Sequence, residues 1–214
     1  MKGHAVRCII AMLGLLALLP GVGRSQESNP PFFTAVFGAL DSLAQDSAFQ
    51  ALAGSKTKWE VFGMAKDDAL GRLPDDQLAD FLQVFVRSLA HADAADCAGM
   101  WKKGLAEGLT PLGMHMSMED ARGWGRWYVN MAWASVRDLP LAPMADADEV
   151  GRWMLTKRAQ LDEPDRLRII RAMSPGASDA DACWLPQFIY TSMVSPDSPA
   201  DLRVARAIMF GREP

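Results

Sequence analysis

The sequence predicts an all-α fold, a single compact bundle of roughly eight to ten helices with one disulfide. Apolar residues recur at helical spacing along most of the 214-residue chain, and helix-start signals separate the apolar segments. Valine, isoleucine and threonine are scarce, and no long stretch alternates between polar and apolar residues. Only the segment 188–194 has the composition of a strand, and one strand makes no sheet.

The first 25 residues have the layout of a secretory signal peptide. Lys2 and Arg7 precede an uncharged apolar run of 11 residues, 9–19, and the small residues Gly23 and Ser25 follow it. A helix that spans a bilayer needs roughly 20 apolar residues, so we expect cleavage behind Ser25 and no stable membrane anchor afterwards. The expected organisation is a signal peptide at 1–25 and a single all-α domain at 26–214, periplasmic or secreted and of bacterial type.

The charge of the chain excludes some classes of partner. The formal net charge is −4, and residues 1–25 contain three basic residues and no acidic one, so residues 26–214 carry −7. Phosphate backbones and anionic lipid surfaces repel such a chain. Nucleic acid is therefore not an expected partner, and no cofactor is indicated.

Helix starts recur along residues 26–214. In each of them a short polar side chain caps the free backbone N–H groups, and an acid or amide stands three residues later. Proline at the first helical positions gives the same signal, since its missing N–H is not needed there. The pairs are Ser47 with Gln50, Thr57 with Glu60, Ser117 with Asp120, Asp146 with Glu149 and Ser198 with Asp201; the prolines are Pro74, Pro164 and Pro199.

Three apolar stripes at helical spacing predict the buried faces of the helices between these starts. Polar residues such as Arg87, Arg122 and Arg126 lie off the stripes and are expected in solvent. The stripes are Leu78, Phe81, Leu82, Phe85 and Leu89; then Cys97, Met100, Trp101 and Leu105; then Trp124, Trp127, Tyr128, Met131 and Val136.

Residues 26–214 contain two cysteines, Cys97 and Cys183. In an oxidising compartment an even number of cysteines favours a disulfide, and we expect these two to be joined. The alternative is two separate buried thiols. Pro186 follows Cys183 closely, and we expect a helix to restart at this proline.

The common catalytic motifs are absent from the sequence, including those of serine hydrolases, zinc proteases and P-loop enzymes. Paired acids are abundant but stand mostly in first helical turns, where the helix dipole favours negative charge. Glu107 is the exception, since it lies between Gly104 and Gly108 at an expected helix end. One alternative function is therefore an envelope glycan hydrolase that uses Glu107.

The string from Met114 to Met118 alternates methionine with His115 and Ser117. Thioethers and an imidazole are soft ligands, so a second alternative is a copper-binding protein that uses this string. The competing interpretation is that Met116 and Met118 pack around a helix start capped by Ser117.

The helix with Trp124 and Trp127 also contains Gly123, Gly125 and the arginines Arg122 and Arg126. Glycine inside a helix costs about 1 kcal/mol relative to alanine, which indicates either close approach of another helix or an open binding face. Arginine and tryptophan are typical of interface hot spots. Arg122, Trp124, Arg126 and Trp127 are the candidate partner-binding residues, and a tightly packed core helix is the alternative.

These observations together predict an exported, non-enzymatic binding protein that acts by protein–protein contact, of the inhibitor or immunity type. The prediction rests on elimination, because an exported domain without a catalytic set acts by contact. The sequence does not identify the protein partner.

Overall fold

The computed structural model describes residues 30–64, 69, 71–103, 112–194 and 198–210. These residues form ten helices of seven or more residues and no strand, so the predicted all-α fold is confirmed. None of the described helices is both long enough and apolar enough to cross a bilayer. In chain order the helices are α2 (Pro31–Ala44), α3 (Ser47–Ala53), α4 (Lys58–Met64), α6 (Asp75–His91), α7 (Ala94–Lys103), α9 (Met118–Val136), α10 (Ala147–Ala159), α11 (Glu163–Ala172), α12 (Asp179–Thr191) and α13 (Pro199–Phe210).

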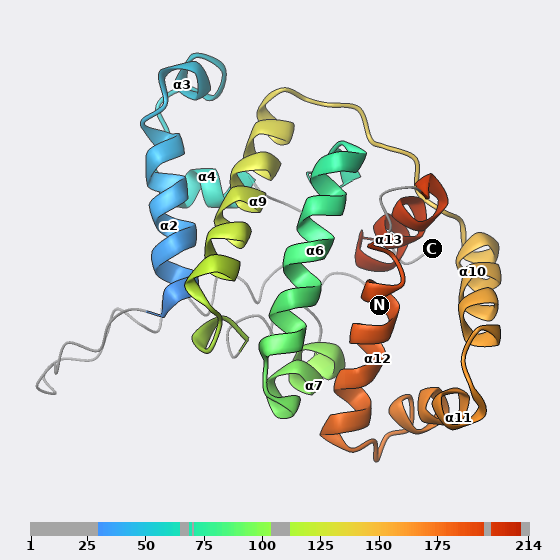
Figure 1. Ribbon diagram of the computed structural model, residues 1–214. Coiled ribbons are helices and arrows are strands. Elements are labelled where there is room, and N and C mark those ends of the chain that lie inside the picture. The colour runs from blue at the N-terminus through green and yellow to red at the C-terminus, as the bar shows by residue number, and fades with distance from the viewer. Residues whose placement is uncertain (1–29, 65–68, 70, 104–111, 195–197, 211–214) are drawn as a thin grey trace, which may run out of the picture.

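Four helices stand side by side in the order α2, α9, α6, α12 (Figure 1). The pairing of α2 with α9 is the most extensive among the described helices. Helix α4 packs on α2 and α9, and α7 packs on α12. Helix α13 lies in contact with both α6 and α10. Helix α9 therefore lies inside the row, with a neighbour on each flank.

The predicted helix starts are largely correct. The Ser117 hydroxyl accepts from the backbone N–H of Asp120 at 3.1 Å at the start of α9. Asp146 and Glu149 form a reciprocal capping box at α10. One cap is corrected: Asp46, and not Ser47, caps α3, and its carboxylate accepts from the Phe49 N–H at 2.8 Å.

The predicted helix restart at Pro186 is wrong. Helix α12 runs through this proline without a break, and Pro186 itself is buried. A proline inside a helix costs about 3 kcal/mol, because one backbone hydrogen bond is lost. Packing of α12 against α6, α7 and α11 stabilises the continuous helix. The strand-like segment 188–194 lies mostly within the same helix.

The core is centred on aromatic side chains of α6 and α9. The Trp124 side chain is fully buried, and the rings of Phe32, Phe81 and Phe85 meet it edge-on. Trp127 stacks on Phe81 with ring centroids 4.0 Å apart. Aromatic pairs of this kind add about 0.5–1.5 kcal/mol each beyond the burial of their area.

Gly123 and Gly125 let α9 approach both of its neighbours closely. A Cβ on Gly123 would lie 2.7 Å from a methyl carbon of Val84 on α6, and a Cβ on Gly125 would lie 3.0 Å from the carbonyl oxygen of Ala35 on α2. The two residues differ by about 200° around the helix, so each serves one flank. The glycines are therefore explained by close helix packing.

The predicted disulfide between Cys97 and Cys183 is confirmed. It joins α7 to α12, and the two Cα atoms are 5.0 Å apart. Cys97 is fully buried and Cys183 nearly so. The bond closes a loop across 86 positions of the sequence.

We predict that Gly123→Ala lowers the free energy of unfolding by about 1–3 kcal/mol, because the new methyl overlaps Val84. Gly151→Ala is the matched control, since its Cβ would meet nothing within 4 Å in α10. The control should gain up to about 1 kcal/mol from its helix propensity. Urea unfolding measures both, and equal effects of the two substitutions would contradict the close packing of α6 and α9.

We predict that the double substitution Cys97→Ser and Cys183→Ser lowers the free energy of unfolding by up to about 4.5 kcal/mol, because the unfolded chain gains loop entropy. Unfolding is measured with and without a reductant. Reductant should destabilise the wild type and leave the double variant unchanged. If reductant does not change the free energy of unfolding of the wild type, the disulfide makes no such contribution.

Candidate functional site

A groove of about 610 Å³ follows α9 between α2 and α6. Ala35 and Ala39 of α2 form one side, and polar residues of α6 form the other. Helix α9 forms the base with Arg122, Arg126 and Asn130 at intervals of one helical turn. The close packing that the two glycines permit thus leaves an open channel over α9 that both polar and apolar side chains line.

Arg122 and Arg126 are exposed, and both line the groove. No ion pair or hydrogen bond joins either guanidinium to another described residue. Several other arginines of the described chain are paired, as Arg206 is with Asp75 at 2.7 Å and Arg203 with Glu149 at 2.8 Å. The groove therefore holds two guanidinium groups whose donors are available to a ligand.

Trp127 also lines the groove, although it is only 4% exposed. Its indole N–H is buried and has no acceptor among the described residues. A buried donor without a partner costs about 1–3 kcal/mol. The nitrogen itself is inaccessible, so this N–H is not part of the exposed surface of the groove.

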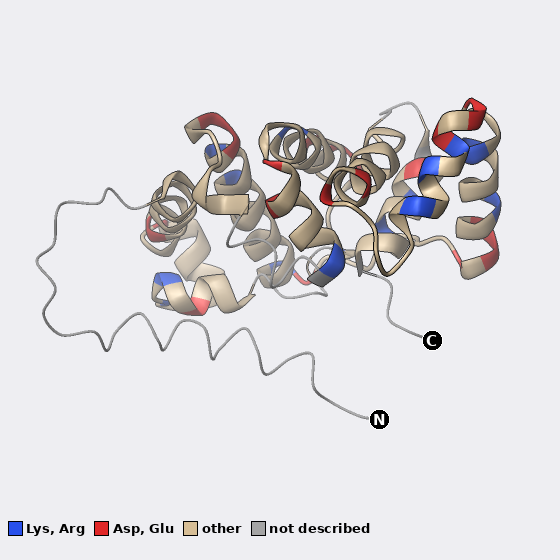
Figure 2. Ribbon diagram, turned by 90° about the horizontal axis from the view of Figure 1, so that it is seen from below, with Lys and Arg blue, Asp and Glu red and all other residues tan. Residues whose placement is uncertain are grey.

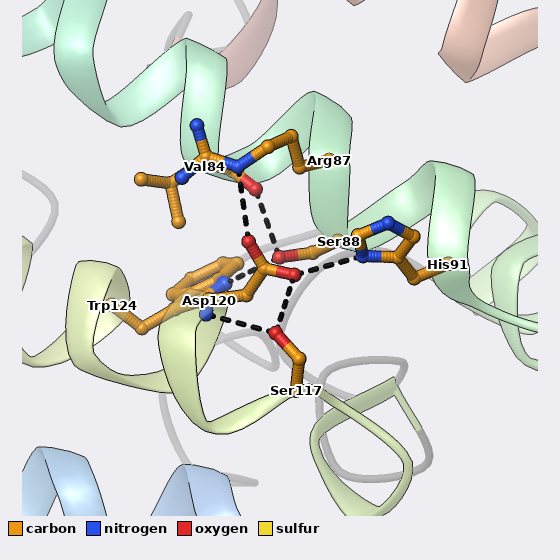
Figure 3. Close-up of polar contacts among 7 residues, drawn as sticks. All are labelled: Val84, Arg87, Ser88, His91, Ser117, Asp120 and Trp124. Carbon is orange, nitrogen blue, oxygen red and sulfur yellow. Dashed lines mark hydrogen bonds and ion pairs between the residues drawn. The ribbon is translucent and has the colours of Figure 1, made fainter.

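Arg87, the third arginine of the groove, is held from below by a buried carboxylate (Figure 3). Asp120 is 2% exposed and accepts from Arg87 Nε at 3.1 Å, from the Ser117 hydroxyl at 2.9 Å and from His91 Nδ1 at 3.0 Å. Burial alone would raise the pKa of Asp120, but these hydrogen bonds and the charge of Arg87 lower the pKa below its usual value of 3.8. The network joins α6 to the start of α9.

A separate pair of hydrogen bonds joins α9 to α6 nearby. The Trp124 indole N–H donates to the Ser88 hydroxyl at 3.1 Å, and Ser88 donates in turn to the Val84 carbonyl oxygen at 2.9 Å (Figure 3). Both side chains are buried, so each hydrogen bond satisfies a group that water does not reach. Trp124 is thereby fixed in the core.

The aspartate, histidine and serine of this network do not form a nucleophilic triad. Ser117 and His91 both bind the Asp120 carboxylate, and no hydrogen bond joins Ser117 to His91. A serine nucleophile needs its base within hydrogen-bond reach. Since Ser117 also caps α9, the role of the network is to fix the start of α9 against α6.

The candidate partner-binding residues divide into two groups. Arg122 and Arg126 lie at the surface, as the sequence analysis expects. Trp124 and Trp127 are buried, so their rings belong to the core and do not project toward a partner. Helix geometry gives the reason, because α9 has neighbours on both flanks and buries more than half of its circumference.

His115 lies beside two carboxylates, those of Asp93 and Asp96. His115 Nδ1 lies 2.8 Å from Asp96 Oδ2, and Asp93 is close enough for all three side chains to contact one ion. The neighbouring Met116 is buried, whereas Met114 and Met118 are largely exposed. The oxygen ligands suit harder ions than Cu(I), and capping of α7 accounts for the position of Asp93. Glu107, the other alternative, lies outside the described residues.

Comparison of the chain with models of known protein families, with characterised proteins and with solved structures finds no match. The groove therefore has to be interpreted from its own chemistry.

The sequence predicts that Arg87 is exposed, and it is, but the sequence does not predict that Arg87 pairs with the buried Asp120. From the sequence, Asp120 is expected only at a helix start. A usable signal was present, since Arg87 and His91 stand four residues apart and so share one face of their helix. What the sequence lacked was the position of Asp120 opposite that face.

We predict that Asp120→Asn lowers the free energy of unfolding by about 1–3 kcal/mol near pH 7, because the negative charge and one of the two acceptor oxygens that Arg87 and His91 use are lost. The pKa of Asp120 is lower in the folded than in the unfolded chain, so its stabilisation is present above the unfolded value and is lost as the pH falls. The gap between wild type and variant should therefore narrow below about pH 4. Urea titrations across this range measure the gap, and a constant gap would refute the role of the charge.

Proposed function

We propose that this protein is an exported binding protein that acts by contact with a protein partner, of the inhibitor or immunity type, and that the groove over α9 is its contact surface. The observation that carries the proposal is the pair Arg122 and Arg126, exposed, unpaired within the described chain and one helical turn apart. Arginine is enriched where interfaces concentrate their binding energy.

The surroundings of the pair support this use. The Trp127 and Phe81 rings stack beneath the groove, which gives the arginines a rigid base. A surface that is ordered before binding loses less conformational entropy when it binds. Export, which the layout of residues 1–25 favours, would bring the groove to partners in the bacterial envelope.

We predict that Arg126→Glu weakens partner binding roughly thirtyfold, which corresponds to about 2 kcal/mol, since a carboxylate replaces a positive anchor. Stability should change by less than about 0.5 kcal/mol, because the side chain is exposed. Wild type and variant serve as baits in an envelope extract, with quantitative mass spectrometry as the measurement.

Arg152→Glu is the matched control, an exposed arginine on α10 outside the groove. Acidic and basic residues both occur at the α10 and α11 end of the molecule, so this control changes charge in mixed surroundings (Figure 2). The proposed surface requires a protein that Arg126→Glu loses and Arg152→Glu retains. If both baits recover the same proteins in the same amounts, the groove is not the contact surface.

A further inference from the structure

We infer that the occupant of the groove is an acidic peptide segment of the partner, whose two carboxylates bind Arg122 and Arg126. This inference rests on the proposed function and adds the chemistry of the partner.

The charge of the groove is opposite to that of the chain. Three arginines and one aspartate, Asp80, line it, whereas the whole chain carries a net charge of −4. Asp120 already binds Arg87 and Asp80 adds one negative charge, so the net charge left for a ligand is about +1, at Arg122 and Arg126. An anionic group is therefore attracted to this part of the surface in particular.

The groove is elongated along the helices. Its lining residues on α6 extend from Gln77 to Arg87, which is about 15 Å along a helix axis, and those on α9 extend from Arg122 to Asn130, about 12 Å. A row of this length suits a segment of several residues better than a compact ligand. The amides of Gln77, Gln83 and Asn130 offer donors and acceptors for a peptide backbone.

The distance between Arg122 and Arg126 determines how far apart the two acidic residues of the bound peptide must be. Their Cα atoms are separated by about 6 Å along α9, because four residues rise 1.5 Å each. Carboxylates on a partner segment match this distance at two residues apart in an extended chain or at four apart in a helix. Each guanidinium binds a carboxylate through two parallel hydrogen bonds, which favours arginine and carboxylate over less directional pairs.

The Trp127 ring lies beneath the groove, because it stacks on Phe81 and is only 4% exposed. Its indole N–H is buried, so the donors offered to a peptide are those of the exposed arginines and amides. A nucleic acid is a poorer occupant, since the rest of this acidic chain repels a phosphate backbone.

The test is a selection of random displayed peptides, long enough to span about 15 Å, on the full protein. The recovered peptides are then bound to wild type, to the double variant Arg122→Glu with Arg126→Glu, and to the control Arg152→Glu with Arg158→Glu. We expect peptides that the groove variant loses by at least roughly tenfold in affinity and the control retains. Those peptides should be enriched in aspartate or glutamate two to four residues apart, and their glutamine versions should bind as weakly as the groove variant does.

The outcomes separate this inference from the function it rests on. Peptides that depend on the groove but lack acidic pairs would overturn the inference and leave the contact surface standing. Peptides that bind the groove variant as well as wild type would overturn both. Inorganic phosphate that displaces the peptides at equal concentration would show an anion site without peptide preference, which also overturns the inference. Thermal unfolding by circular dichroism checks each variant, and Arg122→Gln with Arg126→Gln replaces the charge reversal if that variant does not fold.

Discussion

The close approach of α9 to both α6 and α2 determines how the central helices pack. Gly123 permits contact with Val84 of α6, and Gly125 permits contact with Ala35 of α2. With a larger residue at either position, one helix would have to move outward and the row of helices would open. The helix propensity lost at two glycines, about 1 kcal/mol each, is offset by the packing that they allow.

This close packing explains why the tryptophans are buried while the arginines are exposed on the same helix. Trp124 and Trp127 fill the space between α9 and α6, where Phe81 meets both rings. Arg122 and Arg126 face away from that space, along the line where α9 is uncovered. The exposed arginines and the buried tryptophans thus occupy different faces of one helix, and the stacked rings of Trp127 and Phe81 lie beneath the groove.

The buried carboxylate of Asp120 connects the core to the groove. It orients Arg87 at the groove wall and ties the start of α9 to α6 through His91 and Ser117. A buried charge is unfavourable unless hydrogen bonds compensate for it, and here three side chains do so. Its stabilising effect is therefore specific to one relative position of the two helices, which also keeps Arg87 in place.

The sequence by itself determined what depends on local chemistry. Helix starts such as Ser117 and Asp146 are readable because a cap and its N3 partner are three residues apart, and the buried stripe of α6 is readable because its period is that of a helix. The disulfide was readable because residues 26–214 offer a single pairing, Cys97 with Cys183. Only the tertiary structure shows that α12 continues through Pro186, that Gly123 and Gly125 serve close helix packing, and that Asp120 lies opposite Arg87. These features depend on contacts between helices far apart in the chain, and such contacts leave no periodic trace in the sequence of either partner.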